Sequence, residues 1–156
     1  TAFSFKNLED QIRSIAIFII VDFMWNTIKR NMKKRILIVD EAWYLMKTQA
    51  SAEFLWDFAK RARKYNLGLT TITQDIEDFL STDLGKTIVT NSSIQILMKQ
   101  SPAAIDKLAE VFYLSEGEKS LLLSANVGEG LFFAGSSHVA MRVVSSDEEH
   151  KLISSN

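Results

Sequence analysis

The chain has 156 residues, of which 47% are hydrophobic, and its 18 basic and 19 acidic side chains give a formal net charge of −1. A chain of this length buries roughly 70% of the surface that its unfolded form exposes, so we expect a globular core. Six glycines, one proline and no cysteine exclude collagen-like or disordered chains, disulfide scaffolds and cysteine zinc sites. The balanced charge also disfavours a protein that simply coats nucleic acid.

The first predicted element is a helix over residues 8–30, for which Asn7 is the expected cap. Its most apolar stretch, residues 15–25, is shorter than the about 20 residues of a transmembrane helix and contains Asp22. We therefore expect a helix that is buried between layers or against another subunit.

A strand is predicted next, over residues 35–41. Four consecutive branched apolar residues lead directly into Asp40 and Glu41. Such continuous apolar runs are typical of parallel strands that are covered on both faces.

The remaining chain alternates between helical and strand patterns. The predicted elements are a helix over 51–65, a strand over 69–74, short helical segments over 75–90, a strand over 94–99, a helix opened by Pro102, a helix with a capping box of Ser115 and Glu118, and a hairpin over 130–144 that turns at 136–137. Strands separated by helices indicate an α/β fold with a mostly parallel sheet and a C-terminal hairpin. No repeat or composition break divides the chain, so we expect one domain or part of one.

Carboxylates at the end of the first strand are the strongest local signal for chemistry. In open α/β sheets, ligands bind beyond the carboxyl ends of the strands. Asp40 is placed to hold the waters of Mg²⁺, and Glu41 to polarise a water for attack, as in the Walker B segment of P-loop NTPases. The simpler alternative is that both residues only form the turn that follows a buried strand.

Two further strand ends carry polar side chains. Gln74 ends the second predicted strand, and its amide can donate to a phosphate oxygen while it accepts from a water. Lys99 and Gln100 end the third. If the three ends meet at one sheet edge, they form a phosphate-handling site.

A basic cluster at the end of the 51–65 helix has two interpretations. Lys60, Arg61, Arg63 and Lys64 complement the helix dipole and form a solvated face, or one arginine reaches the phosphates of a neighbouring subunit as an arginine finger. Periodicity alone leaves both interpretations open.

One tripeptide resembles the end of a phosphate-binding loop without being one. Gly85, Lys86 and Thr87 match the last positions of G-x-x-x-x-G-K-[ST], but the position of the first glycine is occupied by Leu80. The tripeptide also follows the Asp40 strand, so we expect no Walker A loop within this chain.

Several longer segments carry a resemblance to a known family. They are ILIVDEAWYLM (36–46), FAKRARKYNLGLTTITQDIEDF (58–79), NSSIQILMKQ (91–100), FYLSEGEKSLLLSANVGEGLFFAG (112–135) and DEEHKLI (147–153). Together they resemble the VirB4 family, the ATPases of type IV secretion and conjugation machines that include TraC and TrbE-like proteins. The resemblance covers nearly the whole chain, from about Leu8 onward.

The resemblance implies a RecA-like P-loop NTPase core related to the conjugative coupling proteins and to the HerA/FtsK translocases. It assigns roles by position: Asp40 to Mg²⁺, Glu41 to catalysis, Gln74 to γ-phosphate sensing, Arg61 and Arg63 to an arginine motif, Lys99 and Gln100 to a later Lys-Gln motif, and Gly128 and Gly130 to a Gly-x-Gly-Leu segment. Family members carry a Walker A loop upstream and a separate N-terminal domain. We therefore expect residues 1–156 to be the C-terminal portion of the ATPase domain, with residues 1–5 as the tail of a preceding strand.

The family further implies ATP and Mg²⁺ as cofactors and a ring, expected to be hexameric, with ATP between subunits. It implies a cytoplasmic location at the inner membrane, bound only peripherally, with other secretion components, a coupling protein and DNA as partners. A DNA-translocating motor of the coupling-protein or HerA/FtsK kind is the alternative. Without a Walker A loop, the isolated chain is expected to be nearly inactive, as a non-catalytic interaction module would be.

Overall fold

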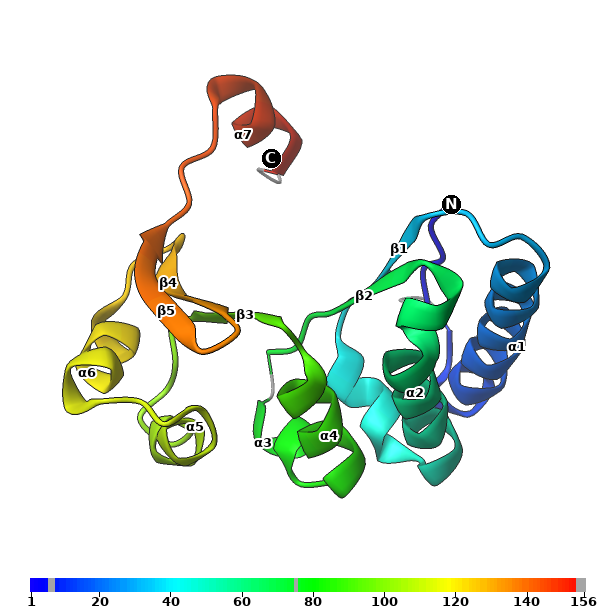
Figure 1. Cartoon of the computed structure of the whole chain (residues 1–156), viewed down its shortest axis with the longest axis horizontal. Coiled ribbons are helices and arrows are strands. Elements are labelled where there is room, and N and C mark those ends of the chain that lie inside the picture. The colour runs from blue at the N-terminus through cyan, green and yellow to red at the C-terminus, as the bar shows by residue number, and fades with distance from the viewer. Residues whose placement is uncertain (6–7, 75, 154–156) are drawn as a thin grey trace. The chain divides into compact units, whose positions relative to one another are not determined.

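The computed structural model describes residues 1–5, 8–74 and 76–153, and the expected cap Asn7 lies outside them. The chain divides into two compact units, Thr1–Asn91 and Ser92–Asn156 (Figure 1). That residues 1–156 form the C-terminal portion of one ATPase domain stays a prediction. Residues 1–5 have no regular secondary structure, so the expected strand tail is not formed by the described chain.

The first unit contains two short strands, and helices precede, separate and follow them along the chain. Its elements are α1 (Asp10–Arg30), β1 (Arg35–Val39), the 3₁₀ helix η1 (Ala42–Lys47), α2 (Gln49–Arg61), the 3₁₀ helix η2 (Ala62–Tyr65), β2 (Leu67–Thr71), α3 (Ile76–Leu80) and α4 (Asp83–Asn91). The helix predicted over 51–65 thus changes to a 3₁₀ helix over its last turn. Asn66 ends that turn with a left-handed backbone, φ 54°.

The two strands of the first unit form a parallel pair, as predicted. Arg35 is opposite Leu67 and Val39 is opposite Thr71, so both strands end at the same edge. Parallel strands need a crossover connection between them, and η1, α2 and η2 provide it.

The helices of the first unit cover one face of this strand pair. Ile28 of α1 and Phe58 of α2 are buried with Leu67 of β2, and Leu37 of β1 packs against the same cluster. The opposite face is open: Ile36 is 74% exposed and Ile38 is 62% exposed. The expectation of a strand covered on both faces is therefore not met within the described chain, because the contacts of α1 and α2 fall on a single face.

Helix α1 is also less buried than the sequence predicts. Val21 and Ile28 are buried, but the apolar residues on its other side are each more than half exposed: Ile12, Ile15, Phe18, Ile19 and Phe23. Among the helices that the structure describes, none has the length and apolarity required to cross a membrane.

The second unit is an antiparallel sheet with helices. Its elements are β3 (Ile94–Met98), α5 (Ile105–Phe112), α6 (Glu116–Ser124), β4 (Glu129–Ala134), β5 (Ser137–Arg142) and α7 (Asp147–Ile153). The α/β class and the C-terminal hairpin are confirmed. The third strand differs from the expectation: β3 pairs antiparallel with β4, so the described strands form one parallel and two antiparallel pairs.

Local sequence signals explain most of the boundaries in the second unit. The capping box of Ser115 and Glu118 is confirmed at the start of α6. Pro102 lies in the turn before α5 rather than in its first position, because the helix begins only at Ile105. Helix α7 was not predicted, although Ser146 and Glu149 have the spacing of a second capping box and bond to each other in that way.

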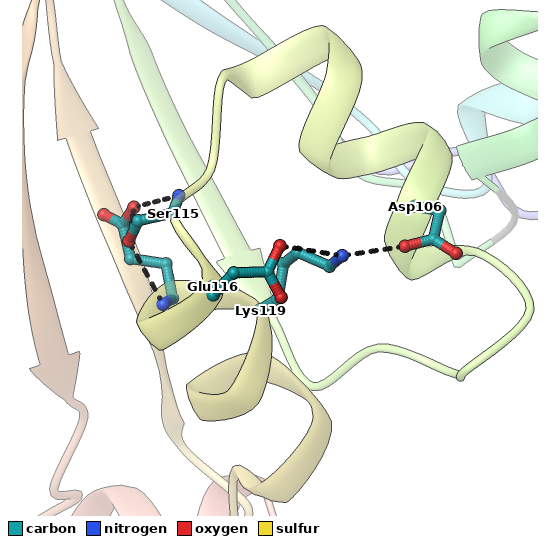
Figure 2. Close-up of polar contacts among 5 residues, drawn as sticks. Asp106, Ser115, Glu116 and Lys119 are labelled. Carbon is teal, nitrogen blue, oxygen red and sulfur yellow. Dashed lines mark hydrogen bonds and ion pairs between the residues drawn. The ribbon is translucent and has the colours of Figure 1, made fainter.

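Helices α5 and α6 of the second unit are held by buried leucines and by ion pairs. Leu108, Leu122 and Leu131 are almost completely buried. Figure 2 shows the Lys119 ammonium between two carboxylates, 2.9 Å from Asp106 of α5 and 3.3 Å from Glu116 of α6. Lys119 of α6 therefore connects α6 with α5 electrostatically.

Candidate active site

The segments at the carboxyl ends of β1 and β2 are joined by backbone hydrogen bonds. The amide of Ile72 donates to the carbonyl of Val39 (2.9 Å), and the amide of Ala42 donates to the carbonyl of Ile72 (2.8 Å). Ala42 is fully buried. These bonds fix the backbone immediately before and after Asp40 and Glu41.

Glu41 lies at the centre of the polar contacts on this edge. Its Oε1 accepts a hydrogen bond from Nε2 of Gln74 (2.9 Å), and its Oε2 accepts one from the indole Nε1 of Trp43 (2.6 Å). Its backbone is left-handed, with φ 50°. This conformation costs a non-glycine residue roughly 1–2 kcal/mol, and such strain is concentrated at functional sites. The strand ends predicted at 40–41 and 73–74 are thus in direct contact.

Asp40 is exposed beside this cluster, and its role in holding Mg²⁺ stays a prediction. Its Oδ1 accepts from the amide of Glu41 (3.0 Å), which orients the carboxylate. Within the described residues, no group of three or more carboxylate, histidine or cysteine side chains forms a protein cage for a metal. Mg²⁺ bound to a nucleotide needs no such cage, since it keeps several waters and binds one or two carboxylates together with phosphates.

The two arginines singled out in the sequence lie toward the opposite end of the strand pair. Arg61 ends α2 and pairs with Asp57 at 3.3 Å, with both side chains largely exposed, while Arg63 is exposed in η2. Both residues precede β2, whereas Gln74 follows it. A five-residue strand spans about 16 Å, so the arginines and the Glu41 cluster flank opposite ends of β2.

Lys99 and Gln100 follow β3 and belong to the second unit. The side-chain amide of Gln100 donates to the carbonyl of Met98 (3.1 Å), and the backbone N–H of Gln100 donates to the carbonyl of Leu122 (3.0 Å). Lys99 is exposed. The expectation that this strand end converges with the other two stays a prediction.

Gly128 and Gly130 have packing reasons to be glycine. Gly128 has φ 85°, and its carbonyl accepts from the amide of Val143 (2.8 Å). A Cβ at Gly130 would lie 2.2 Å from the carbonyl oxygen of Leu97 on the neighbouring strand. Gly130 also lines a hollow of about 340 Å³ that includes Arg142. A role of these glycines in nucleotide binding stays a prediction.

Trp43 contacts Glu41 but was not among the site residues predicted from the sequence, because aromatic residues in an apolar chain more often occupy core or interface positions. Its place two residues after Glu41 was the available signal. The tripeptide of Gly85, Lys86 and Thr87 lies inside α4, where the amide of Gly85 donates to the hydroxyl of Thr82.

The comparisons with known proteins agree with the observed fold. The family described as TraG P-loop domain matches residues 3–132. The solved structure of VirB4 from Thermoanaerobacter pseudethanolicus is similar, with 34% identity and a TM-score of 0.84, and the match covers 93% of this chain and 40% of that one. This chain therefore spans less than half the length of that relative. No curated protein matches.

A more distant structure shares the fold alone. The genome packaging NTPase B204 from Sulfolobus turreted icosahedral virus 2, solved in complex with ATP-γS, has 16% identity and a TM-score of 0.56. That match covers 80% of this chain and 62% of the packaging protein. The family match over most of the chain, together with the similarity to VirB4, shows that this chain belongs to the TraG P-loop domain family.

Proposed function

We propose that the protein containing this chain hydrolyses ATP to power a type IV secretion or conjugation machine. The observation that carries the proposal is the hydrogen bond between Glu41 and Gln74, which are 33 residues apart. It joins a carboxylate and an amide from the ends of two parallel strands, the place where α/β sheets bind ligands. The family match and the similarity to VirB4 support the same function.

In this proposal, Asp40, Glu41 and Gln74 have separate roles. Glu41 accepts a proton from the water that attacks the γ-phosphate, and Gln74 donates to a γ-phosphate oxygen. Asp40 holds Mg²⁺ through its waters, and the bound ion neutralises charge on the β- and γ-phosphates. The Walker B segment then corresponds to residues 36–41.

The substitution Glu41→Gln in the full-length protein tests this assignment. The amide keeps the size of the side chain and one of its two acceptor oxygens but is far too weak a base to take the proton, so we expect hydrolysis to fall about 10²- to 10⁴-fold. ATP binding should be retained. The matched control is Glu53→Gln, an exposed residue of α2 that bonds to Gln49. Unchanged turnover of Glu41→Gln would contradict the proposed function.

An arginine acting between subunits is the second part of the proposal. Because Arg61 and Arg63 flank the end of β2 away from Gln74, we propose that one of them serves the nucleotide of a neighbouring subunit rather than the site beside Glu41. We propose a ring, hexameric as the family resemblance implies, at the cytoplasmic face of the inner membrane, with other secretion components and the coupling protein as partners.

Mixed rings test the role of Arg63. Arg63→Ala subunits retain Glu41, and Glu41→Gln subunits retain Arg63, so some interfaces in a mixture contain both native groups. Partial recovery of ATPase activity is expected on mixing. Lys60→Ala, which removes a nearby cation that lies over the Trp56 ring, is the control and should need no rescue. Mixed rings without recovered activity would contradict action between subunits.

Two further measurements separate the alternatives. Calorimetry on the 156-residue chain should detect no tight MgATP binding, since a Walker A loop supplies most of the phosphate contacts. Tight binding would contradict this expectation. Stimulation of the full-length ATPase by DNA would favour the DNA-translocating motor, and stimulation by secretion components alone would favour the secretion ATPase.

A further inference from the structure

The indole N–H of Trp43 donates a hydrogen bond to one of the two carboxylate oxygens of Glu41. From this contact we draw an inference that rests on the proposed function. The 2.6 Å bond from Nε1 to Oε2 is the shorter of the two bonds that Glu41 accepts from side chains. Trp43 is half-buried, whereas Gln74, which holds the other oxygen, is exposed. The two bonds therefore differ in how easily a ligand or water can replace them.

The indole itself is held by its own turn. Trp43 lies in η1, directly after the fully buried Ala42, and its ring meets Tyr44 edge-on at 5.8 Å. The Lys47 ammonium lies 4.5 Å from the centroid of the Trp43 ring. A cation over an aromatic face draws electron density from the ring, and the ring N–H therefore becomes a stronger hydrogen-bond donor. Trp43 and Glu41 thus belong to one short segment after β1, while Gln74 lies in the separate segment that follows β2.

A general base needs one free oxygen directed at the water that it activates, and in this structure both oxygens of Glu41 are engaged. We propose that Trp43 is a positioning residue that keeps Oε2 bound, so that Oε1 alone becomes the base when Gln74 turns from Glu41 to the γ-phosphate of ATP. The arrangement in which both oxygens of Glu41 are hydrogen-bonded is then the state of the site before ATP binds.

The chemical step balances with water as the only co-reactant. A water oxygen forms a bond to the γ-phosphorus, the bond from that phosphorus to the bridging oxygen of ADP breaks, and ADP leaves with the electron pair. Oε1 of Glu41 takes one proton of the water and later releases it to solvent. Trp43 transfers no proton, and its effect is confined to the direction in which Oε1 points.

Trp43→Phe in the full-length protein tests the inference, because it keeps an aromatic ring and removes the N–H. We expect kcat to fall about 10- to 100-fold while KM stays within about threefold, because the substitution misdirects the base without removing a contact to the substrate. Trp56→Phe is the matched control. The Lys60 ammonium also lies 4.5 Å from the centroid of the Trp56 ring, but Trp56 belongs to α2 and not to the segment of Glu41. The control substitution should leave kcat unchanged.

A double substitution separates positioning from packing. If Trp43 acts through Glu41, adding Trp43→Phe to Glu41→Gln should not lower the residual hydrolysis further, because the base is already absent. Additive losses in the double variant would overturn the inference, as would an unchanged kcat for Trp43→Phe. If wild-type protein shows no ATPase activity, or Glu41→Gln retains full turnover, the proposed function itself fails.

Lys47→Met provides a variant that keeps the fold even if Trp43→Phe unfolds, because Lys47 is exposed. It removes the cation over the indole and leaves every atom of Trp43 in place. We expect a two- to fivefold loss of kcat in Lys47→Met, and none in the Glu41→Gln background. A loss of the same size in both backgrounds would contradict an effect through Trp43.

Discussion

The two units of the chain use their carboxylates in different ways. In the first unit, Glu41 accepts from Gln74, a side chain 33 residues away, and from Trp43. In the second unit, each of three glutamates accepts a bond from the backbone N–H of the residue three positions before it: Glu118 from Ser115, Glu129 from Asn126 and Glu149 from Ser146.

These local hydrogen bonds also lower the pKa of the glutamates in the second unit and so favour their charged form. The backbone N–H of Ser115 and then its hydroxyl lower the pKa of Glu118, and the adjacent His138, 2.7 Å away, contributes in the same direction. The backbone N–H and side chain of Asn126 lower the pKa of Glu129. These carboxylates stabilise turns and helix ends, whereas one of the two side chains that donate to Glu41 comes from a segment 33 residues away. The comparison agrees with the proposal that places the chemistry in the first unit and gives the second a scaffold role.

The two strand-end glutamines give the sharpest test of this comparison. Gln74→Ala in the full-length protein should lower kcat for ATP hydrolysis about 100-fold, because it removes a donor to the developing charge on the γ-phosphate. Gln100→Ala should cost less, since Gln100 bonds to the backbone of its own strand end at Met98. Steady-state kinetics on both variants measures the difference. Equal losses would place the second unit in the chemistry as well.

A glycine pair tests the scaffold role of the second unit. Gly130→Ala should destabilise the chain by about 1–3 kcal/mol, because the added Cβ meets the carbonyl of Leu97 on the next strand. Gly117→Ala in α6 is the control: its Cβ finds its nearest atom, the Ser115 hydroxyl oxygen, at 4.0 Å. It should be neutral or stabilising by up to about 1 kcal/mol. Denaturant unfolding followed by circular dichroism measures both, and a stable Gly130→Ala protein would contradict the packing argument.

The capping box of α6 should contribute a smaller amount. Ser115→Ala removes the hydroxyl that accepts from the amide of Glu118, and we expect a loss of about 1 kcal/mol in the free energy of unfolding. Ser120→Ala, an exposed position in the same helix, should change stability by less. If the two variants unfold alike, the cap does not stabilise α6.

The smallest effect is the dependence of stability on acid. Glu118, Glu129 and Glu149 have a pKa below the ordinary 4.5 in the folded chain. Their contribution is therefore complete above about pH 4.5 and is lost as the pH falls through the lower folded values. Thermal unfolding between pH 6 and pH 3 should show the melting temperature falling below pH 4.5, and the Glu118→Gln variant should show a shallower fall. A melting temperature that rose on acidification would contradict the sign.

The sequence by itself determined the features that depend on neighbours within a few residues. The run of branched apolar residues before Asp40 predicted β1, the spacing of Ser115 and Glu118 predicted the start of α6, and Gln74 was correctly expected beside the end of the Asp40 strand. A second capping box at Ser146 was equally readable and predicts α7. The cap and strand signals are local because they act over one turn or a few residues, whereas the place of Gln74 follows from the rule that parallel strands end at one sheet edge.

Only the tertiary structure decided that β3 pairs antiparallel with β4, that one face of β1 stays uncovered and that Trp43 donates to Glu41. The strand at β3 could be expected from its own residues, but its antiparallel partner β4 lies more than 30 residues later. Ile36 belongs to a pattern typical of buried strands and is nevertheless exposed, because α1 and α2 both contact the other face. The left-handed backbone of Glu41 and its bond to Trp43 likewise follow from a turn fixed by Ala42 and Ile72. Each of these features depends on contacts between distant segments, and a local pattern of residue types contains no information about them.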